Sequence, residues 1–358
     1  MDIRAYITDQ NGNATIQPEG KITVMRYDWH CIGGPRYATL KVTEVDSLSL
    51  WRLAEMLGYR VLLGDNQGRR VWWGYINDVV LHIQGRVLSV GLDDMANTIM
   101  VHYSDPQITG TQAKTANAIN TVSVARYGTK ELIYSTSDIS TAAAAEALRD
   151  QLLAIRYRPV IQRSIEGVSG DYAEIHCRGW YSTLDWKYYA NASTASVATS
   201  TQIGAIVTSA GQWIAGTDII TASGVSMSEA RDGNEKALQY VDALLKIGVS
   251  GGRRYMATVT EDRRLVVSQE PAQYTADYII TVDKMLYDNY NVLVMDQLCP
   301  VGVWVADNSV LLPRQSETVS DPGGFFIESA EYNAESYSLR IQPRGRIDPL
   351  DVVSIIDG

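Results

Sequence analysis

The chain has 358 residues, of which 46% are hydrophobic and 20% are charged. This length exceeds one ordinary hydrophobic core, so we expect several domains, and the balanced composition argues against extensive disorder. The net charge of −10 disfavours a protein that wraps DNA, because like charge repels nucleic acid at long range.

The three cysteines, Cys31, Cys177 and Cys299, lie far apart in the sequence. An odd number at such spacing argues against a disulfide framework and fits synthesis in a reducing cytoplasm. Every apolar run falls short of the roughly 20 residues that a membrane span needs, and the N-terminus lacks the pattern of a signal peptide. We therefore expect no membrane span.

Residues 1–105 alternate between apolar and polar side chains in the way that is typical of strands. The candidate strands cover 21–27, 37–45, 60–63, 70–76, 79–83 and 86–92. Asp28 and Trp29 interrupt the first pattern, residues 32–35 are typical of a turn or loop, and 48–57 has helical spacing. We predict an N-terminal β-barrel domain over residues 1–105.

A second domain with mixed helix and strand is expected over residues 106–189, and it can contribute strands to a second barrel. Its first part, 106–121, has the composition of a linker. A strand is expected at 131–134, a helix at 141–155 with Ser137 or Asp138 as its N-cap, and another strand at 172–178. Residues 179–186 form a dense aromatic segment.

The pattern changes at residue 190 from strand-like alternation to segments with helical spacing, and residues 190–290 are predicted to form an inserted α+β domain. A weak helix is expected at 201–213, followed by a stronger one that Asn234 caps and Gly248 ends. The segment 255–268 predicts a hairpin. The pattern then returns to strands, so residues 291–358 are expected to form a C-terminal β module that completes the second barrel.

One short phrase occurs near both ends of the chain. Residues 61–66 and residues 303–308 both run from apolar residues into Asp-Asn, and an aromatic pair and further alternation follow each of them. A strand, a polar turn, an aromatic strand and a closing strand would make the same small β module twice. The second copy has a longer gap before its aromatic pair, over 309–324.

No catalytic constellation stands out. The four histidines, His30, His82, His102 and His176, include no spaced metal pair. His30 and His176 each precede a cysteine, but adjacent strand residues point to opposite faces. No phosphate-binding loop or nucleophile elbow is present. We predict no catalytic, metal-binding or cofactor-binding residue, and no cofactor.

The carboxylate pairs Asp93-Asp94 and Glu261-Asp262 fit solvated turns better than glycan cleavage, which needs two placed carboxylates.

Aromatic clusters are the best candidates for binding, since Tyr and Trp combine a large apolar body with a polar tip. In a strand, Trp73 and Tyr75 share one face while Trp72 takes the other, so one face can be core while the other meets a partner. The candidate subunit or partner interface comprises Trp72, Trp73, Tyr75, Trp180, Tyr181, Trp186, Trp304, Arg253 and Arg254. Sugar platforms would need similar chemistry.

The order of these segments resembles the baseplate or tail-tip hub proteins of long-tailed bacteriophages. The resemblance is carried by 61–94, the helix after 137–142, the phrase Gly-Trp-Tyr-Ser-Thr-Leu at 179–184, the helix and hairpin over 236–268, and the closing β module around Gly-Val-Trp-Val at 302–305. It covers most of the chain as a pattern of segments.

The resemblance implies a structural, non-enzymatic viral protein of the virion tail tip, synthesised in the cytoplasm of the bacterial host. It implies two related barrels in one chain and a homotrimer, whose six barrels would match a six-fold tail tube above a three-fold tip. Expected partners are the tail tube or distal tail protein, the tape measure protein and tip or fibre proteins. DNA would pass through without specific binding during ejection.

The predicted fold class is therefore β-rich α+β and multidomain, with two similar small β-barrels and helix-containing insertions between them. The alternative function is that of a carbohydrate-binding or glycan-cleaving β protein, with Trp72, Trp73, Trp180 and Trp186 as sugar platforms.

Overall fold

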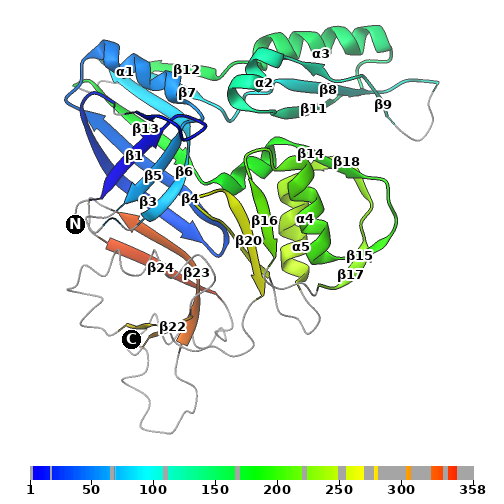
Figure 1. The fold of residues 1–358 in the computed structure, drawn as a ribbon. Coiled ribbons are helices and arrows are strands. Elements are labelled where there is room, and N and C mark those ends of the chain that lie inside the picture. Colours follow the sequence, from blue (N-terminus) through cyan, green and yellow to red (C-terminus); the bar gives the residue numbers. More distant parts are fainter. Residues whose placement is uncertain are drawn as a thin grey trace, which may run out of the picture.

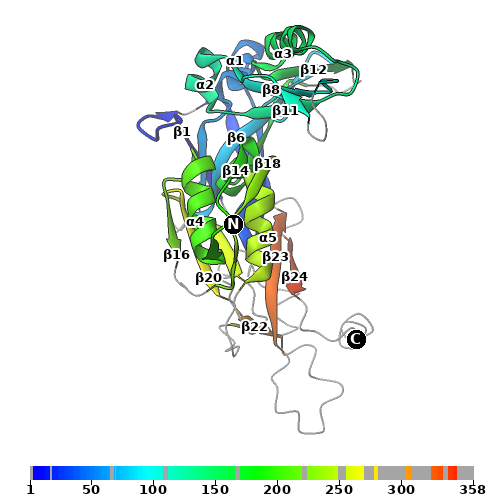
Figure 2. The same ribbon diagram turned by 90° about the vertical axis from the view of Figure 1, so that its right-hand side faces the viewer.

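A computed structural model describes residues 3–16, 18–64, 68, 70–107, 112–165, 170–219, 224–248, 255–269, 278–280, 304–307, 324–333 and 338–344. The fold is β-rich, and one sheet of 16 strands runs through it. Two helical units lie beside this sheet, one with α2 and α3 and one with α4 and α5 (Figure 1). The α3 unit and strands β22–β24 occupy opposite ends of the molecule in both side views (Figure 2).

The first hundred residues supply most of the large sheet. Its strands there are β1 (Arg4–Thr8), β2 (Thr15–Ile16), β3 (Lys21–His30), β4 (Ile32–Thr43), β5 (Arg60–Gly64), β6 (Arg70–Ile83) and β7 (Arg86–Gly91). Helix α1 (Ser47–Leu53) and the 3-10 turn η1 (Ala54–Met56) connect β4 to β5. Asp46 caps α1 by accepting hydrogen bonds from two backbone N–H groups of its first turn.

Two later strands complete this sheet. β13 (Tyr172–Arg178) lies between β4 and β6 and is antiparallel to both, while β12 (Val160–Ile165) pairs with β7. Strands from both sides of the predicted boundary at residue 105 therefore share one sheet. The boundaries of all four predicted domains stay predictions.

The strands β1, β5, β6, β13, β4 and β3 are neighbours in that order, and β1 also lies in contact with β3. This arrangement curves around a core that includes Trp29, Leu40 and Trp72, all fully buried. Among the described residues no ladder of hydrogen bonds joins β1 to β3. The closed barrel, and with it the arrangement of two barrels, stays a prediction.

The first helical unit has its own small core. Its elements are β8 (Thr98–Tyr103), β9 (Ala113–Lys114), β10 (Ala118–Ile119), α2 (Thr121–Tyr127), β11 (Glu131–Ser135) and α3 (Ala142–Arg156). Helix α3 packs on β8, and Val101, Tyr103 and Ala145 are buried between them.

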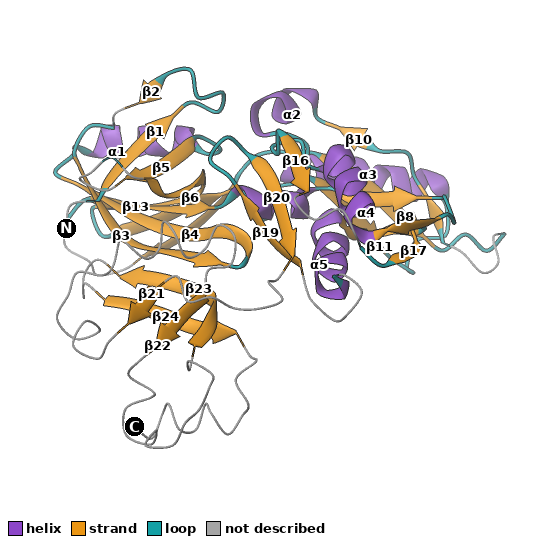
Figure 3. Cartoon of the chain, turned by 60° about the horizontal axis from the view of Figure 1, so that its bottom comes forward, coloured by secondary structure: helices purple, strands orange, loops and turns teal. Residues whose placement is uncertain are grey.

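The second helical unit covers a branch of the large sheet. Its elements are the 3-10 segment η2 (Trp180–Trp186), β14 (Tyr188–Asn191), β15 (Ser196–Ala198), α4 (Thr199–Ala210), β16 (Gly216–Ile219), β17 (Ser226–Ser228), β18 (Arg231–Lys236), α5 (Ala237–Ile247), β19 (Tyr255–Val259) and β20 (Arg264–Gln269). Helices α4 and α5 pack side by side against β16, β20 and β19 (Figure 3). Strand β19 joins the branch to the large sheet by pairing with β4.

The C-terminal strands extend the large sheet from the outer edge of β3. They are β21 (Tyr278–Ile280), β22 (Trp304–Asp307), β23 (Gly324–Asn333) and β24 (Ser338–Arg344). Strand β23 pairs with β3, and the buried Tyr332 packs its ring on Tyr27 with 5.2 Å between ring centroids. None of the described helices is long and apolar enough to cross a membrane.

The two copies of the repeated phrase begin comparable three-strand meanders, β5–β6–β7 and β22–β23–β24. In the first, Leu62 lies opposite Trp73. In the second, Trp304, which takes the place of Leu62 in the phrase, lies opposite Phe326 of the second aromatic pair. The two phrases therefore pair with their aromatic strands in the same register.

Several local predictions were wrong. The segment 32–35, predicted as a turn or loop, does include the chain reversal of the β3–β4 hairpin, because His30 pairs with Gly34 and both Gly33 and Gly34 have positive φ values, but it is also the start of strand β4. Strand β3 continues through Asp28 and Trp29 with irregular register. The predicted strands 70–76 and 79–83 form the single strand β6.

The predicted linker also contains ordered structure, because β9 and β10 lie within 106–121. Two predicted helix caps were wrong as well. Thr141 caps α3, and α5 begins after Lys236 while Asn234 bonds to Asp232 instead.

The contact between β6 and the end of β13 predicts a strict requirement for glycine at position 74. A Cβ at Gly74 would lie 2.1 Å from the carbonyl oxygen of Arg178 and 2.5 Å from the Trp72 ring. Gly74→Ala should lower the free energy of unfolding by about 2 kcal/mol, measured by chemical denaturation. Gly204→Ala in α4 is the control: its Cβ meets nothing closer than 3.8 Å, so this change should raise stability by ~0.5–1 kcal/mol. Equal effects would contradict the described contact.

Candidate functional site

Most of the predicted interface aromatics lie inside the chain. Trp72 and Tyr75 are at most 1% exposed, and Trp180, Tyr181 and Trp186 are between 4% and 8% exposed. Tyr75 joins the large sheet to η2 by packing on Trp180 and Trp186, and Tyr181 joins η2 to helix α5 by its hydrogen bond to Asp242. A single chain does not test their contact with another subunit, which stays a prediction.

The two faces of β6 separate as the alternation predicts. Trp73 and Tyr75 face the second helical unit: the indole N–H of Trp73 donates to the carbonyl of Val259 at 2.7 Å, and the Tyr75 ring packs on Trp180 and Trp186. Both faces of the strand therefore contact this chain itself, since Trp72 is fully buried on the other face. Trp72 and Trp180 present too little ring surface for a sugar to stack on them, which weighs against the sugar-platform alternative.

For three residues of the predicted interface, the structure gives no side-chain environment. Arg253 and Arg254 lie outside the described residues. The backbone of Trp304 belongs to β22, where it pairs with Phe326.

A buried lysine connects the two helical units to the sheet. Lys130 precedes β11 and is 6% exposed, and its ammonium donates to the carbonyl of Leu92, just after β7. The same ammonium lies 4.9 Å from the centroid of the Trp186 ring. Burial lowers the pKa of Lys130 to about 8. The lysine therefore joins β7, β11 and η2 at one point.

Asn97 fixes the backbone around this lysine. Its side chain is fully buried, accepts a hydrogen bond from the backbone N–H of Lys130 at 2.8 Å and donates to the carbonyl of Gly128 at 2.7 Å. Because a buried amide is costly unless its bonds are made, this arrangement holds the segment before β11 in one conformation.

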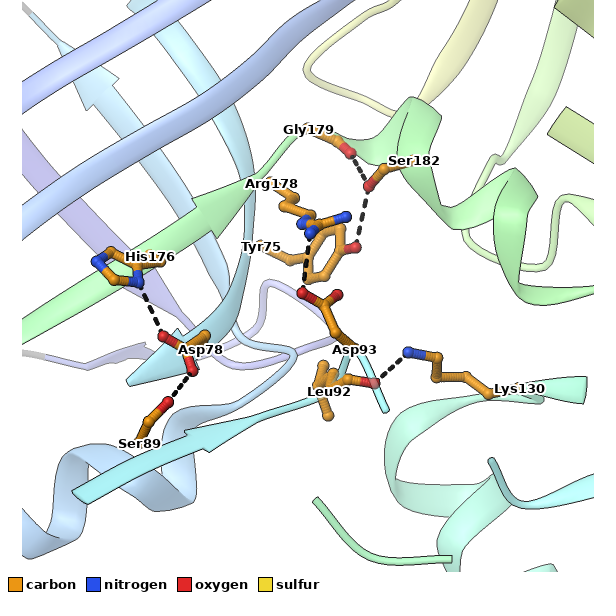
Figure 4. Close-up of polar contacts among 10 residues, drawn as sticks. All are labelled: Tyr75, Asp78, Ser89, Leu92, Asp93, Lys130, His176, Arg178, Gly179 and Ser182. Carbon is orange, nitrogen blue, oxygen red and sulfur yellow. Dashed lines mark hydrogen bonds and ion pairs between the residues drawn. The ribbon is translucent and has the colours of Figure 1, made fainter. Parts of the chain in front are cut away.

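Arg178, at the end of β13, forms the second polar contact of this region. Its guanidinium donates to a carboxylate oxygen of Asp93 at 2.8 Å (Figure 4). Beside it, the Tyr75 hydroxyl lies 3.0 Å from the Ser182 hydroxyl, which donates to the carbonyl of Gly179 at 2.8 Å. We call Tyr75, Leu92, Asp93, Lys130, Arg178, Ser182 and Trp186 the junction cluster.

A second lysine repeats this pattern at the end of β18. The ammonium of Lys236 donates to the carbonyl of Glu131 and lies 3.9 Å from the centroid of the Tyr188 ring. Burial lowers its pKa to about 8, and burial also raises the pKa of the neighbouring Asp185. Partly buried charges of both signs thus connect β11 to the second helical unit.

A His–Asp–Ser group lies on the sheet near the junction cluster. Nδ1 of His176 is 2.8 Å from Asp78, and the Ser89 hydroxyl donates to the other oxygen of Asp78 at 2.7 Å (Figure 4). In a catalytic triad the histidine bonds to the nucleophilic hydroxyl, whereas here the hydroxyl bonds to the carboxylate. The hydrogen bond that Asp78 accepts from the His176 ring raises the pKa of this histidine. The group therefore orients side chains but does not activate the serine.

Metal and thiol chemistry find little support among the residues that the structure describes. No group of three or more His, Cys, Asp or Glu side chains there is placed to hold a metal ion. Cys31 and Cys177 are both buried, and burial raises the pKa of the Cys177 thiol. A buried thiol with a raised pKa is a poor nucleophile. Cys299 lies outside the described residues.

The sequence identified the aromatic half of the junction cluster but missed its charged half. Asp93 was considered only as part of the pair Asp93-Asp94 in a solvated turn, and no motif connects it to Lys130 or Arg178. The dense aromatic segment 179–186 was the available signal, because an aromatic ring face can stabilise a cation that is removed from water.

No family model matches the chain, and no curated protein matches it. Among solved structures, it is similar to the 43 kDa tail protein of prophage MuSo2 from Shewanella oneidensis, with 10% identity over 78% of this chain and 56% of that one, and a TM-score of 0.40. The tail protein from Neisseria meningitidis MC58 gives 7% identity, 78% and 55% coverage, and a TM-score of 0.40.

Prophage tail protein gp18 from Listeria monocytogenes EGD-e is 9% identical, with 99% of both chains covered and a TM-score of 0.39. The chain spans just over half the length of the first two proteins. All three are named as tail proteins, and likeness at these TM-scores does not establish a shared fold.

The Tyr75 hydroxyl offers a test of the junction cluster. Tyr75→Phe keeps the ring contacts with Trp180 and Trp186 but removes a buried hydrogen bond to Ser182, so it should lower the free energy of unfolding by about 1 kcal/mol. Tyr6→Phe is the control, because Tyr6 is 46% exposed. A loss in the control as large as in Tyr75→Phe would contradict the assigned role.

Burial of Lys130 predicts a distinctive dependence of stability on pH. Its pKa is about 8 in the folded chain against 10.5 when unfolded, so the unfolded state binds more protons between these values. The contribution of this group to stability therefore rises with pH from about 8 to about 10.5. Lys130→Met should remove that rise.

The measurement is the difference in unfolding free energy between wild type and Lys130→Met across this pH range, which cancels the titration of other groups. Lys21→Met, at an exposed position, controls for the loss of a lysine charge. A difference that stays constant with pH would show that the ammonium is not desolvated as described.

Proposed function

We propose that this chain is a structural, non-enzymatic protein of a bacteriophage tail and forms the hub of its tip or baseplate. The observation that carries the proposal is the repeated meander. Two strand phrases, separated by most of the chain, each pair with an aromatic strand in the same register, as Leu62 with Trp73 and Trp304 with Phe326.

A repeated module has a purpose in a symmetric assembly. If each meander belongs to one barrel, three chains supply six similar barrels, which can meet a six-fold tube on one side and a three-fold tip on the other. The pairing of β23 with β3 supports this proposal, because it attaches the second meander to the first sheet within the same chain.

The charge of the chain fits a ring around a DNA path. A net charge of −10 repels DNA, so DNA can pass a surface of this kind without being held. The proposed neighbours are the tail tube or distal tail protein, the tape measure protein and the tip or fibre proteins. The junction cluster supports a structural role, since its contacts join both helical units to the sheet.

The proposal predicts how the chain assembles. Purified chain, alone or mixed with its tube-side partner, should form a particle with three times the 39.5 kDa mass of the chain, measured by native mass spectrometry. Antibody labelling of particles from the strain that encodes the chain should place the label at the distal end of the tail. A stable dimer together with label on the capsid, or no label on particles, would contradict the hub.

A further inference from the structure

A pocket of about 420 Å³ lies where the β3–β4 hairpin, the start of η2, helix α5 and strand β19 meet. This volume falls within the range of about 300–1,000 Å³ that is usual for ligand sites. Apolar side chains from two sides line part of it, among them Ile32 and Pro35 from β4 and Leu238 and Leu245 from α5. The pocket adjoins the junction cluster and shares Arg178 and Ser182 with it.

One residue that lines this pocket, Tyr255, has a hydroxyl group without a hydrogen-bond partner among the described residues. The residue is fully buried. Buried hydroxyls in native proteins are nearly always bonded, so an orphan of this kind calls for a partner. A ligand in the pocket would supply one. The neighbouring Tyr181 hydroxyl already donates to Asp242 at 2.7 Å.

The charged side chains of the pocket favour an anion. Arg36, Arg178 and Lys246 line it together with a single carboxylate, Asp242. Burial raises the pKa of that carboxyl, which weakens its opposition to a second acid. The ring of Tyr37, also in the lining, lies under the guanidiniums of Arg36 and Arg178, with 5.3 Å and 5.6 Å to its centroid.

The guanidinium groups of Arg36 and Arg178 both have N–H groups that remain available to a ligand. Arg36 is 3.9 Å from Asp28, and Arg178 bonds to Asp93 at 2.8 Å, so each is held in place by one carboxylate. A guanidinium has five N–H groups, which leaves several for a ligand. Because these two aspartates offset part of the positive charge, the site suits one carboxylate better than a doubly charged phosphate.

We propose that this pocket binds a carboxylate that carries an apolar group. The cations Arg36, Arg178 and Lys246 attract the carboxylate, the apolar side chains of β4 and α5 receive the apolar group, and the Tyr255 hydroxyl gains its missing hydrogen bond. The carboxylate can belong to a free small molecule or to an acidic residue of another polypeptide. This site does not depend on the proposed hub role.

Paired ligands test the proposal by ligand-observed NMR titration of the full chain. N-acetyl-leucine should bind in a saturable way, and N-acetyl-leucinamide, which lacks the charge, should bind at least about tenfold more weakly. The peptides acetyl-Leu-Glu-Leu-amide and acetyl-Leu-Gln-Leu-amide form a second pair. Binding of the glutamate peptide alone points to an acidic residue of a partner, and binding of N-acetyl-leucine alone points to a free or terminal carboxylate. Either result supports the site.

Two variants connect the binding to the pocket. Tyr255→Phe should weaken binding of the carboxylate about fivefold, while its denaturation midpoint stays equal to wild type or rises, because no bond is lost in the free chain. Arg36→Gln should weaken binding as well. Tyr134→Phe, at an exposed tyrosine of β11, is the matched control and should bind like wild type.

The proposal is overturned if neither carboxylate binds, or if the neutral analogues bind as well as the charged ones. It is also overturned if Tyr255→Phe binds like wild type. A lower denaturation midpoint for Tyr255→Phe would show that the hydroxyl is already bonded in the free chain, and this too would remove the basis of the site.

Discussion

Strand β13 is the constraint on which the arrangement depends. It makes hydrogen bonds to both β4 and β6, so the middle of the large sheet exists only when residues 172–178 return between two strands from the first hundred residues. The end of this strand then places Arg178 beside Asp93, and η2 continues directly from it. The aromatic contacts of Tyr75 with Trp180 and Trp186 follow from that placement.

Local patterns in the sequence located most individual elements. The alternation of 172–178 predicts strand β13 with its observed ends. Gln84 and Gly85, which separate the candidate strands 79–83 and 86–92, form a tight turn between β6 and β7, both with positive φ. The helix expected at 141–155 agrees with α3 to within one residue at each end.

Local sequence patterns could not predict which distant segments pair with each other in the sheet. Nothing in residues 172–178 says that the strand belongs between β4 and β6, because alternation fixes a face and leaves the neighbours open. Composition was also an incomplete guide at residues 32–35, where the glycines of the hairpin reversal belong at the same time to the start of strand β4. The charged part of the junction cluster could not be predicted for a related reason: Lys130 and Leu92 meet only after the first helical unit has packed against the large sheet.

The pairing of β23 with β3 has a consequence for synthesis on the ribosome. Until residues 324–333 leave the exit tunnel, the outer edge of β3 carries backbone groups with no neighbouring strand, and such an edge can recruit strands from other nascent chains. Lys21, Arg26 and Asp28 place charges along that strand, which discourages flat association between chains. The last described strands of the chain thus cover an aggregation hazard that the first strands create.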